Sequence, residues 1–258
     1  LLLGMGRGYQ VPEFDVFGIP QDASRAMFME SLDIVKMAFT EDNFSYDGKF
    51  WKVKNATVFP KPVQKPHPPI YWAGISPATY ELAGRLGYNI LRGPNFTSIS
   101  AVEQAFATYT ESLQKHGHDL AKMDLPFSLK IYVAPSDEEA KAEIHHALWF
   151  YHTLAKLLPG APGRPTPAGY EQYPRDPSSL AALTADQLWD ATVDVGSGTV
   201  FGSPARVIEQ LRFYMSRTRI NHWMLWFKVG GLEHSKVLRS MELFTKHVMP
   251  ALREAEGA

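Results

Sequence analysis

The sequence has no cysteine, no excess of either charge and no apolar run long enough to cross a membrane. The absence of cysteine from the 258 residues excludes a disulfide framework, a thiolate nucleophile and a Cys-ligated metal. Lys and Arg (26) nearly balance Asp and Glu (27), and neither sign forms a block, which argues against a nucleic-acid partner. Because the longest apolar runs are far below the roughly 20 residues of a membrane helix, we expect a cytoplasmic protein without membrane contact.

Metal-ligand spacing is also lacking. His116 and His118 flank a glycine, and His145 and His152 share a helical face one heptad apart. Neither pair has an HExxH motif or clustered carboxylates beside it. We expect no metal site, and we expect His67, between two prolines, to pack within a linker.

The remaining composition, 45% hydrophobic and 12% aromatic, is that of a packed globular protein. A short apolar run, a turn and an amphipathic helix recur along the chain, which is typical of buried parallel strands joined by crossover helices. The pattern predicts parallel strands at Leu1–Met5, Ile70–Ala73, Tyr88–Leu91, Phe127–Val133 and Asn221–Val229, with a shorter apolar run at Thr199–Phe201. We expect the five strands to form one arc in chain order.

Capping residues and a 3.6-residue period indicate the helices between these strands. The predicted helices are Ser24–Thr40, one opened by Ser76 and Pro77, one through Val102 and Leu113, one from Ser136 to about Leu158, Asp186–Thr192, one opened by Ser203 and Pro204, and one through Val237 and Val248. Asp47 and Gly48, between two short apolar runs, predict an antiparallel hairpin outside the main sheet.

This alternation predicts a parallel α/β fold in a single domain, residues 1–258, with insertions at residues 41–66 and 159–200. The sheet is either open and doubly wound or closed into a (β/α)8 TIM barrel. Five strands cannot close a barrel, so a barrel would have its first three strands before Leu1, and this chain would supply strands 4 to 8. The apolar start, Leu1–Leu3, has no polar lead and favours a strand entered partway through a larger protein.

The first predicted strand and helix offer two arginines that could bind an anion. Gly4, Gly6 and Gly8 let a ligand approach the backbone, and Arg7 offers a planar fork of donors to a phosphate or carboxylate. A tight turn with a surface Arg7 explains the same residues. Arg25 faces the positive end of its helix, a conflict that either a nearby anion or a swing into solvent would resolve.

Ser76 and Thr79 lie in the first turn of a helix that directly follows a strand, beside N–H groups without helical partners. The residues fit an anion site or ordinary capping, and Ser203 with Pro204 repeats the signature before another helix. Physical reasoning alone leaves open which helix end holds a ligand. The segment 159–179 is rich in Pro, Gly and Tyr and long for a connector, so we interpret it as a candidate lid.

Three stretches together resemble a known family. GMGRGYQVPEFDVFGIPQDASR at residues 4–25, ISPATYELAGRLG at residues 75–87 and the terminal FTKHVMPAL are similar to bacterial-luciferase-like flavin-dependent monooxygenases of the luciferase α subunit type. The three matches occur in the right order and extend the resemblance from Gly4 to about Leu252.

The resemblance implies a (β/α)8 barrel that holds FMN at the C-terminal ends of its strands, with the N-terminal part missing. The cofactor-binding residues that it implies are Gly6, Arg7, Arg25, Gly74, Ser76 and Thr79. Ile75 stands where the luciferase α subunit has a carboxylate and Gly6 where it has a cysteine, which argues against light emission. The essential histidine of the family lies upstream of Leu1, so no catalytic residue is nominated.

The activity implied by the resemblance is an FMNH2- and O2-dependent monooxygenation of a small apolar organic substrate through a peroxyflavin. The implied partners are a separate NAD(P)H-dependent flavin reductase and a second copy of the chain in a homodimer. Two alternatives stay open. One is an F420-dependent hydride-transfer oxidoreductase on the same fold, and the other is a non-catalytic flavin-binding relative.

Overall fold

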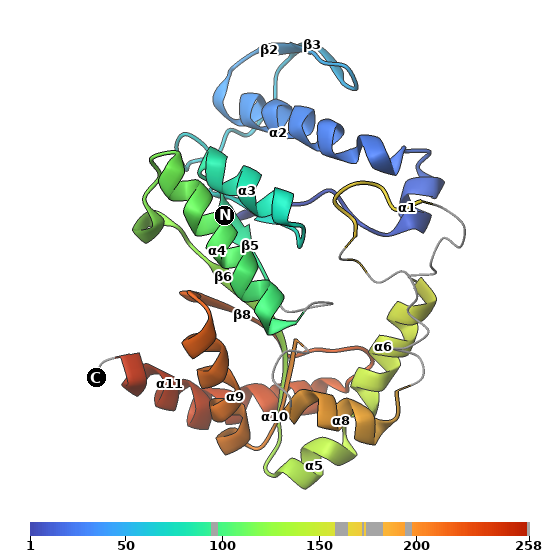
Figure 1. Cartoon of the computed structure of the whole chain (residues 1–258), viewed down its shortest axis with the longest axis vertical. Coiled ribbons are helices and arrows are strands. Elements are labelled where there is room, and N and C mark those ends of the chain that lie inside the picture. The colour runs from blue at the N-terminus through green and yellow to red at the C-terminus, as the bar shows by residue number, and fades with distance from the viewer. Residues whose placement is uncertain (94–97, 158–164, 172, 174–182, 194–197, 257–258) are drawn as a thin grey trace.

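The computed structural model describes residues 1–93, 98–157, 165–171, 173, 183–193 and 198–256 (Figure 1). Its strands are β1 (Leu3–Met5), β2 (Phe44–Asp47), β3 (Lys52–Ala56), β4 (Ile70–Ala73), β5 (Asn89–Leu91), β6 (Pro126–Val133), β7 (Thr199–Gly202) and β8 (His222–Trp226). Its α-helices are α1 (Val11–Val16), α2 (Ser24–Thr40), α3 (Pro77–Leu86), α4 (Ile99–Lys115), α5 (Asp137–Ala142), α6 (His145–Leu157), α8 (Ala185–Val193), α9 (Pro204–Arg217), α10 (His234–Leu243) and α11 (Met249–Glu256). No helix in these ranges is both long and apolar enough to cross a bilayer.

One parallel sheet has the order β1, β4, β5, with β4 in the centre. Residues Ile70–Trp72 of β4 are all buried, as expected for a strand that is covered on both faces. Met5 pairs with Trp72, and Ala73 pairs with Leu91. The C-terminal ends of the three strands therefore meet at one edge of the sheet.

A second parallel sheet has the order β7, β6, β8, and all eight residues of β6 are buried. A parallel bridge between Arg92 and Phe127 connects the two sheets. The prediction of parallel strands is confirmed, since none of the described strands in the two sheets has an antiparallel neighbour. The last strand is shorter than predicted and ends at Trp226 rather than Val229.

The five predicted strands follow the predicted chain order, β1, β4, β5, β6 and β8, since the Arg92–Phe127 bridge joins β5 to β6 and β8 pairs with β6. The apolar run at Thr199–Phe201 forms a further parallel strand, β7, which also pairs with β6. The backbone amide of Ser128 donates to Arg92 and that of Lys130 donates to Gly198, so β5 and β7 lie along the same edge of β6. β6 has eight residues against three in β5 and four in β7, so both short strands fit on one edge. The opposite edge is then available to β8.

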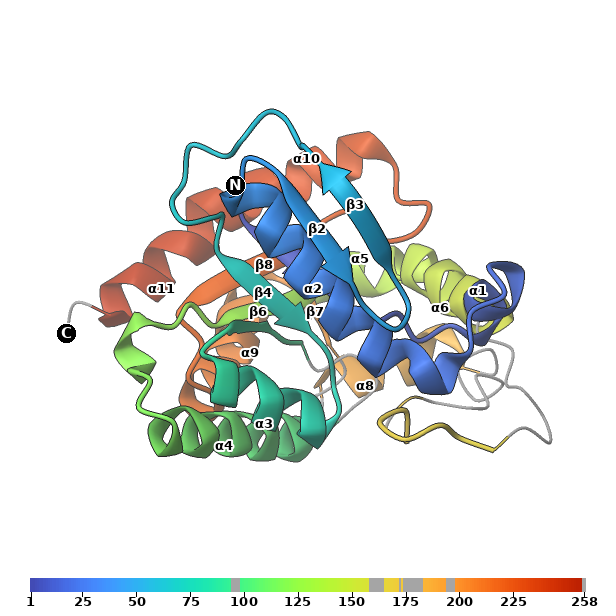
Figure 2. The same cartoon turned by 90° about the horizontal axis from the view of Figure 1, so that it is seen from above.

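The insertion at residues 41–66 contains the predicted antiparallel hairpin, β2 and β3, which lies over α2 and outside the parallel sheets (Figures 1 and 2). Glu30 in α2 supports the turn of the hairpin. Its carboxylate accepts hydrogen bonds from the backbone amides of Lys49, Phe50 and Trp51 at 2.8 to 3.1 Å.

The long helix predicted from Ser136 is interrupted. Ser136 caps α5 by accepting a hydrogen bond from the Glu139 amide at 3.2 Å, as the capping box predicts. However, α5 ends at Ala142 and α6 begins at His145. Glu143 lies at the interruption, where its side chain meets α10.

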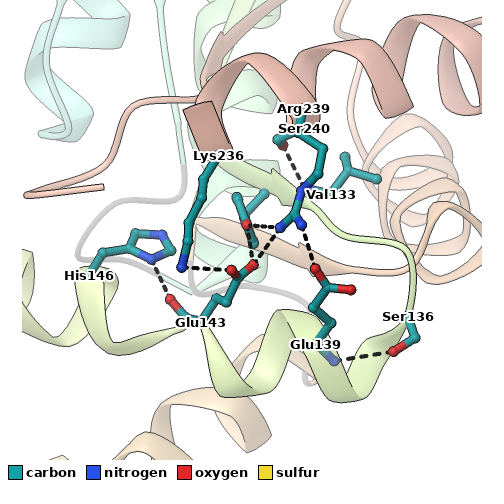
Figure 3. A network of polar contacts seen from close by, with 9 residues as sticks. Val133, Ser136, Glu139, Glu143, His146, Lys236, Arg239 and Ser240 are labelled. Atoms are coloured by element: carbon teal, nitrogen blue, oxygen red, sulfur yellow. Dashed lines mark hydrogen bonds and ion pairs between the residues drawn. The ribbon is translucent and has the colours of Figure 1, made fainter. Parts of the chain in front are cut away.

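Glu143 is the centre of a charged network, which we call the Glu143 network (Figure 3). Its carboxylate contacts Lys236 at 2.6 Å and Arg239 at 2.8 Å, and it accepts a hydrogen bond from the Tyr132 hydroxyl. Arg239 also contacts Glu139 at 2.6 Å. Burial alone would raise the pKa of Glu143, but these partners hold that pKa below its ordinary value. The network therefore ties α5 and α10 together with paired charges.

Candidate functional site

The loops that follow β1 and β4 lie side by side at the C-terminal edge of their sheet. β1 and β4 are neighbours in parallel register, so Gly6 and Gly74 both lie just beyond their strand ends. A Cβ on Gly6 would lie 3.4 Å from the carbonyl oxygen of Ala73, so the two loops touch. A Cβ on Gly74 would lie 2.8 Å from Cγ2 of Thr79, so the second loop needs glycine to approach its helix. Three of the predicted site residues, Gly6, Gly74 and Thr79, thus lie at one edge of the sheet.

Arg7 and Arg25 converge on Gly169, in the segment predicted as a lid. Nη2 of Arg7 donates a hydrogen bond to the Gly169 carbonyl at 3.2 Å. A Cβ on Gly169 would lie 2.7 Å from Nη2 of Arg25 and 3.1 Å from Nη2 of Arg7. Burial and the positive charge of Arg7 lower the pKa of Arg25. Within the described ranges, neither arginine forms an ion pair with a carboxylate. We call Arg7 and Arg25 the arginine pair.

Aromatic side chains hold the lid segment against the loop after β1, beside α1 (Figure 1). Arg7 lies 4.7 Å from the ring centre of Tyr170, and the Tyr170 hydroxyl is 2.9 Å from Oγ of Ser24. Tyr173 stacks on Tyr9 with ring centres 4.7 Å apart. We call Gly169–Glu171 the strap. Residues 159–164, 172 and 174–179 of the predicted lid lie outside the described residues.

The start of α3 has no side-chain cap. Ser76 is the extended N-cap residue before Pro77, but its side chain accepts no hydrogen bond from the first turn. Its hydroxyl instead lies 2.8 Å from that of Thr79. Two neighbouring hydroxyls therefore stand beside the positive end of a helix that no described carboxylate caps.

The start of α9, which has the same Ser-Pro signature, already has hydrogen-bond partners from side chains. The backbone amide of Ser203 donates to the Asp137 carboxylate at 2.7 Å, and Oγ of Ser203 accepts from the Arg206 amide at 3.5 Å. A second anion would meet the negative charge of Asp137 at this position. Of the two helix starts that the sequence leaves equivalent, the structure thus favours the one at Ser76.

Two features of the structure were not predicted as single residues from the sequence: the contacts of Gly169–Glu171 with the arginine pair, and the buried Lys130 in β6. Gly169, Tyr170 and Glu171 were covered only by the composition of the predicted lid, which gave no signal for individual contacts. Lys130 is the one cation in the apolar run of β6, and it lies 5.3 Å from the ring centre of Phe150; burial lowers its pKa to about 8. A lysine within an apolar run indicates an unusual buried charge and could have been noticed in the sequence, although the sequence does not indicate its partner.

The arrangement provides donors for a dianion at one edge of the sheet. The structure brings Arg7 and Arg25 together, and it separately brings Ser76 and Thr79 together. No hydrogen bond or ion pair joins the two groups within the described part of the chain, so their common role as cofactor ligands stays a prediction. Within that part of the chain, no group of three or more His, Asp or Glu side chains could hold a metal ion.

Comparison with known proteins identifies relatives along the whole chain. Residues 1–220 match the family described as Luciferase-like monooxygenase. The oxygenase component of a flavin-dependent trigonelline monooxygenase from Acinetobacter baylyi is 23% identical over 257 residues, which cover 98% of this chain and 68% of the relative. An FMNH2-dependent dimethylsulfone monooxygenase from Pseudomonas putida is 25% identical over 255 residues, which cover 96% and 65%. The chain spans about two thirds of the length of these relatives.

Solved structures share its fold. The monooxygenase RslO1 from Streptomyces bottropensis has a TM-score of 0.76 at 23% identity, covering 98% of this chain and 69% of that one. An F420-dependent secondary alcohol dehydrogenase in complex with an F420–acetone adduct has a TM-score of 0.68 at 17% identity, covering 97% and 69%. These likenesses show a luciferase-like fold of the TIM-barrel type, shared by a monooxygenase and an F420-dependent dehydrogenase. Together with the match over residues 1–220, they show that this chain belongs to the luciferase-like monooxygenase family of flavin-dependent oxidoreductases.

Proposed function

We propose that the chain binds reduced FMN and catalyses the oxidation of a small apolar organic substrate by O2. The observation that carries the proposal is the convergence of Arg7 and Arg25 at the sheet edge where α3 begins without a side-chain cap. Two guanidinium groups repel each other, so their proximity indicates a site for a group with more than one negative charge. The phosphate of FMN is such a group.

In this proposal the residues of the chain bind the flavin through its phosphate. Arg7 and Arg25 hold the phosphate, and the hydroxyls of Ser76 and Thr79 donate to its remaining oxygens. Gly6 and Gly74 let the ligand approach the backbone at the strand ends. When bound, reduced flavin supplies the electrons that let O2 oxidise a substrate.

The tyrosines around the strap cover this edge. Tyr170 is buried and Tyr173 stacks on Tyr9, so the described part of the lid forms an aromatic cover over the loop after β1. In the ligand-free protein this cover shields the loop after β1 from solvent.

The proposed partner of the chain comes from the comparison with its relatives. One relative is named as the oxygenase component of its system, which supports a separate NAD(P)H-dependent flavin reductase for this protein as well. The homodimer, the cytoplasmic location and the assignment of the parallel strands to the last five of a (β/α)8 barrel remain predictions.

F420 is the second candidate cofactor. The fold likeness to an F420-dependent alcohol dehydrogenase supports it. Oxygen consumption separates the candidates. The full-length protein supplied with chemically reduced FMN should consume O2 in step with substrate oxidation, whereas hydride transfer from reduced F420 under anaerobic conditions would contradict the monooxygenase proposal. Tight flavin binding without either activity would support a non-catalytic relative.

The phosphate site is tested by Arg25→Ala in the full-length protein. We expect anaerobic titration with FMNH2 to show affinity weakened by about 1 to 3 kcal/mol, the usual range for a charged hydrogen bond. Arg219→Ala is the matched control, because Arg219 is exposed and precedes β8 at the opposite end of the strands. Equal affinity in Arg25→Ala and the control would contradict the proposed site.

A further inference from the structure

The strap occupies the face of the arginine pair that a phosphate would use. One donor of Arg7 is already bonded to the carbonyl of Gly169, and Arg25 lies against the same residue. The φ of Gly169 is +84°, and a Cβ there would lie 2.7 Å from Nη2 of Arg25. Only glycine allows the strap to approach the guanidinium groups this closely.

Glu171 adds a negative charge to the strap. Both of its carboxylate oxygens accept a hydrogen bond from the Gly169 amide at 2.9 Å, so the carboxylate is held on the residue that the arginines contact. This hydrogen bond, followed by the charges of Arg25 and Arg7, lowers the pKa of Glu171. Glu171 therefore stays ionised at neutral pH, within electrostatic reach of both arginines.

Tyr170 fastens the strap to α2. Its hydroxyl shares a hydrogen bond of 2.9 Å with Ser24, and its ring covers Arg7 and meets Phe14 edge to face. The strap thus offers the arginine pair a carbonyl acceptor, an aromatic face and a carboxylate, which are the interactions that a bound anion would replace.

We propose that the strap is a built-in competitor for the phosphate: in the ligand-free protein Gly169 and Glu171 compensate the arginine pair, and an incoming phosphate displaces them. The proposal rests on the phosphate site of the proposed function. Because strap and ligand exclude each other, every interaction that stabilises the closed strap weakens ligand binding by the same factor.

Glu171→Gln tests the competition. Glutamine keeps an acceptor for the Gly169 amide but removes the charge, so the strap loses its compensation of the arginines. We expect the affinities of the full-length protein for FMN and for inorganic phosphate to rise about 3- to 10-fold, with the gain shrinking as salt is added. Glu111→Gln makes the same change of net charge on the exposed face of α4 and should leave both affinities unchanged. Unchanged or weaker binding by Glu171→Gln would overturn the proposal.

Hydrogen exchange gives a second readout that is independent of activity. The peptide that contains Gly169–Glu171 should exchange faster when FMN or phosphate is bound, because the ligand releases the strap. Slower exchange would mean that the strap closes over the ligand, and it would overturn the proposal.

The two hypotheses fail in different ways. If Arg25→Ala weakens FMN binding while Glu171→Gln leaves it unchanged, the phosphate site stands and the competition is wrong. If Arg25→Ala leaves the affinity unchanged, the phosphate site itself is wrong, and the strap proposal is overturned with it.

Discussion

Two helices of this protein begin with Ser-Pro, and their surroundings differ. The start of α9 is filled, since Asp137 accepts a hydrogen bond from the Ser203 amide at 2.7 Å and Ser203 caps its own helix. The start of α3 has no side-chain cap, and Ser76 directs its hydroxyl to Thr79 instead. The same local sequence therefore serves structure at one place and leaves donors available at the other.

The same contrast separates the charged clusters of the two sheets. In the Glu143 network, carboxylates compensate Lys236 and Arg239, and the cations stabilise the contact of α5 with α10 (Figure 3). In the arginine pair, two cations lie against Gly169, and among the described residues no carboxylate is within ion-pair distance of either. Cations in direct ion pairs with carboxylates indicate structure, whereas cations that converge with no direct ion pair indicate a ligand site. Four predictions test this distinction.

The largest effect is expected for Glu143→Gln. Only 14% of the Glu143 side chain is exposed, and its loss of charge leaves Lys236 and Arg239, whose side chains are 26% and 38% exposed, without full compensation. Breaking such a pair on one side should lower the free energy of unfolding by about 3 kcal/mol. Urea denaturation measures the change. A loss as small as that of a surface ion pair would contradict the structural role of the network.

Acid should destabilise the same region through His146. Burial is the main reason that the pKa of His146 falls to about 4 from 6.5, so the folded protein holds this imidazole neutral. A lowered folded-state pKa gives stability above pH 6.5 that is lost as the pH falls from 6.5 toward 4, by roughly 2 to 3 kcal/mol in total. Denaturation midpoints between pH 7 and 4.5 should show this loss in the wild type. His146→Asn should flatten that dependence, whereas His118→Asn, at an exposed turn, should retain it.

Alanine in place of the serine should affect a different property at each of the two Ser-Pro helix starts. Ser203→Ala removes a cap and should lower the free energy of unfolding by about 0.5 to 1 kcal/mol, with FMNH2 affinity unchanged. Ser76→Ala should weaken FMNH2 binding by about 1 kcal/mol, the value of a neutral hydrogen bond. Parallel denaturation and flavin titration compare the two variants. Weaker flavin binding by Ser203→Ala would remove the distinction between the helix starts.

The smallest effect is expected for the exposed ion pair of Arg217 with Glu103, which connects α9 with α4. Its side chains are 42% and 31% exposed, and water and salt screen such pairs. Arg217→Ala should lower the free energy of unfolding by at most about 0.5 kcal/mol, measured by urea denaturation. A larger loss would mean that exposure is a poor guide to which charges stabilise this fold.

Local patterns predicted much of the fold. The period of α2 predicted its bounds, Ser24–Thr40, and the turn at Asp47 and Gly48 predicted the hairpin. Hydrophobic period and turn chemistry act over a few residues, so they can be read from the chain alone. The place of β7 on the same edge of β6 as β5 could not be read this way, because it depends on the lengths of β5, β6 and β7 together.

The candidate site also has features that the sequence indicated and features that only the tertiary structure decided. The residue types at Arg7, Arg25, Ser76 and Thr79 already indicated anion binding, because guanidinium groups and helix starts have that chemistry wherever they occur. Only the tertiary structure decided that Asp137 fills the start of α9, and that Gly169 lies against the arginine pair. These contacts join residues 66 and 162 positions apart. The sequence determines which side chains can hold a charge, whereas the compensation of that charge depends on segments that meet only when the chain folds.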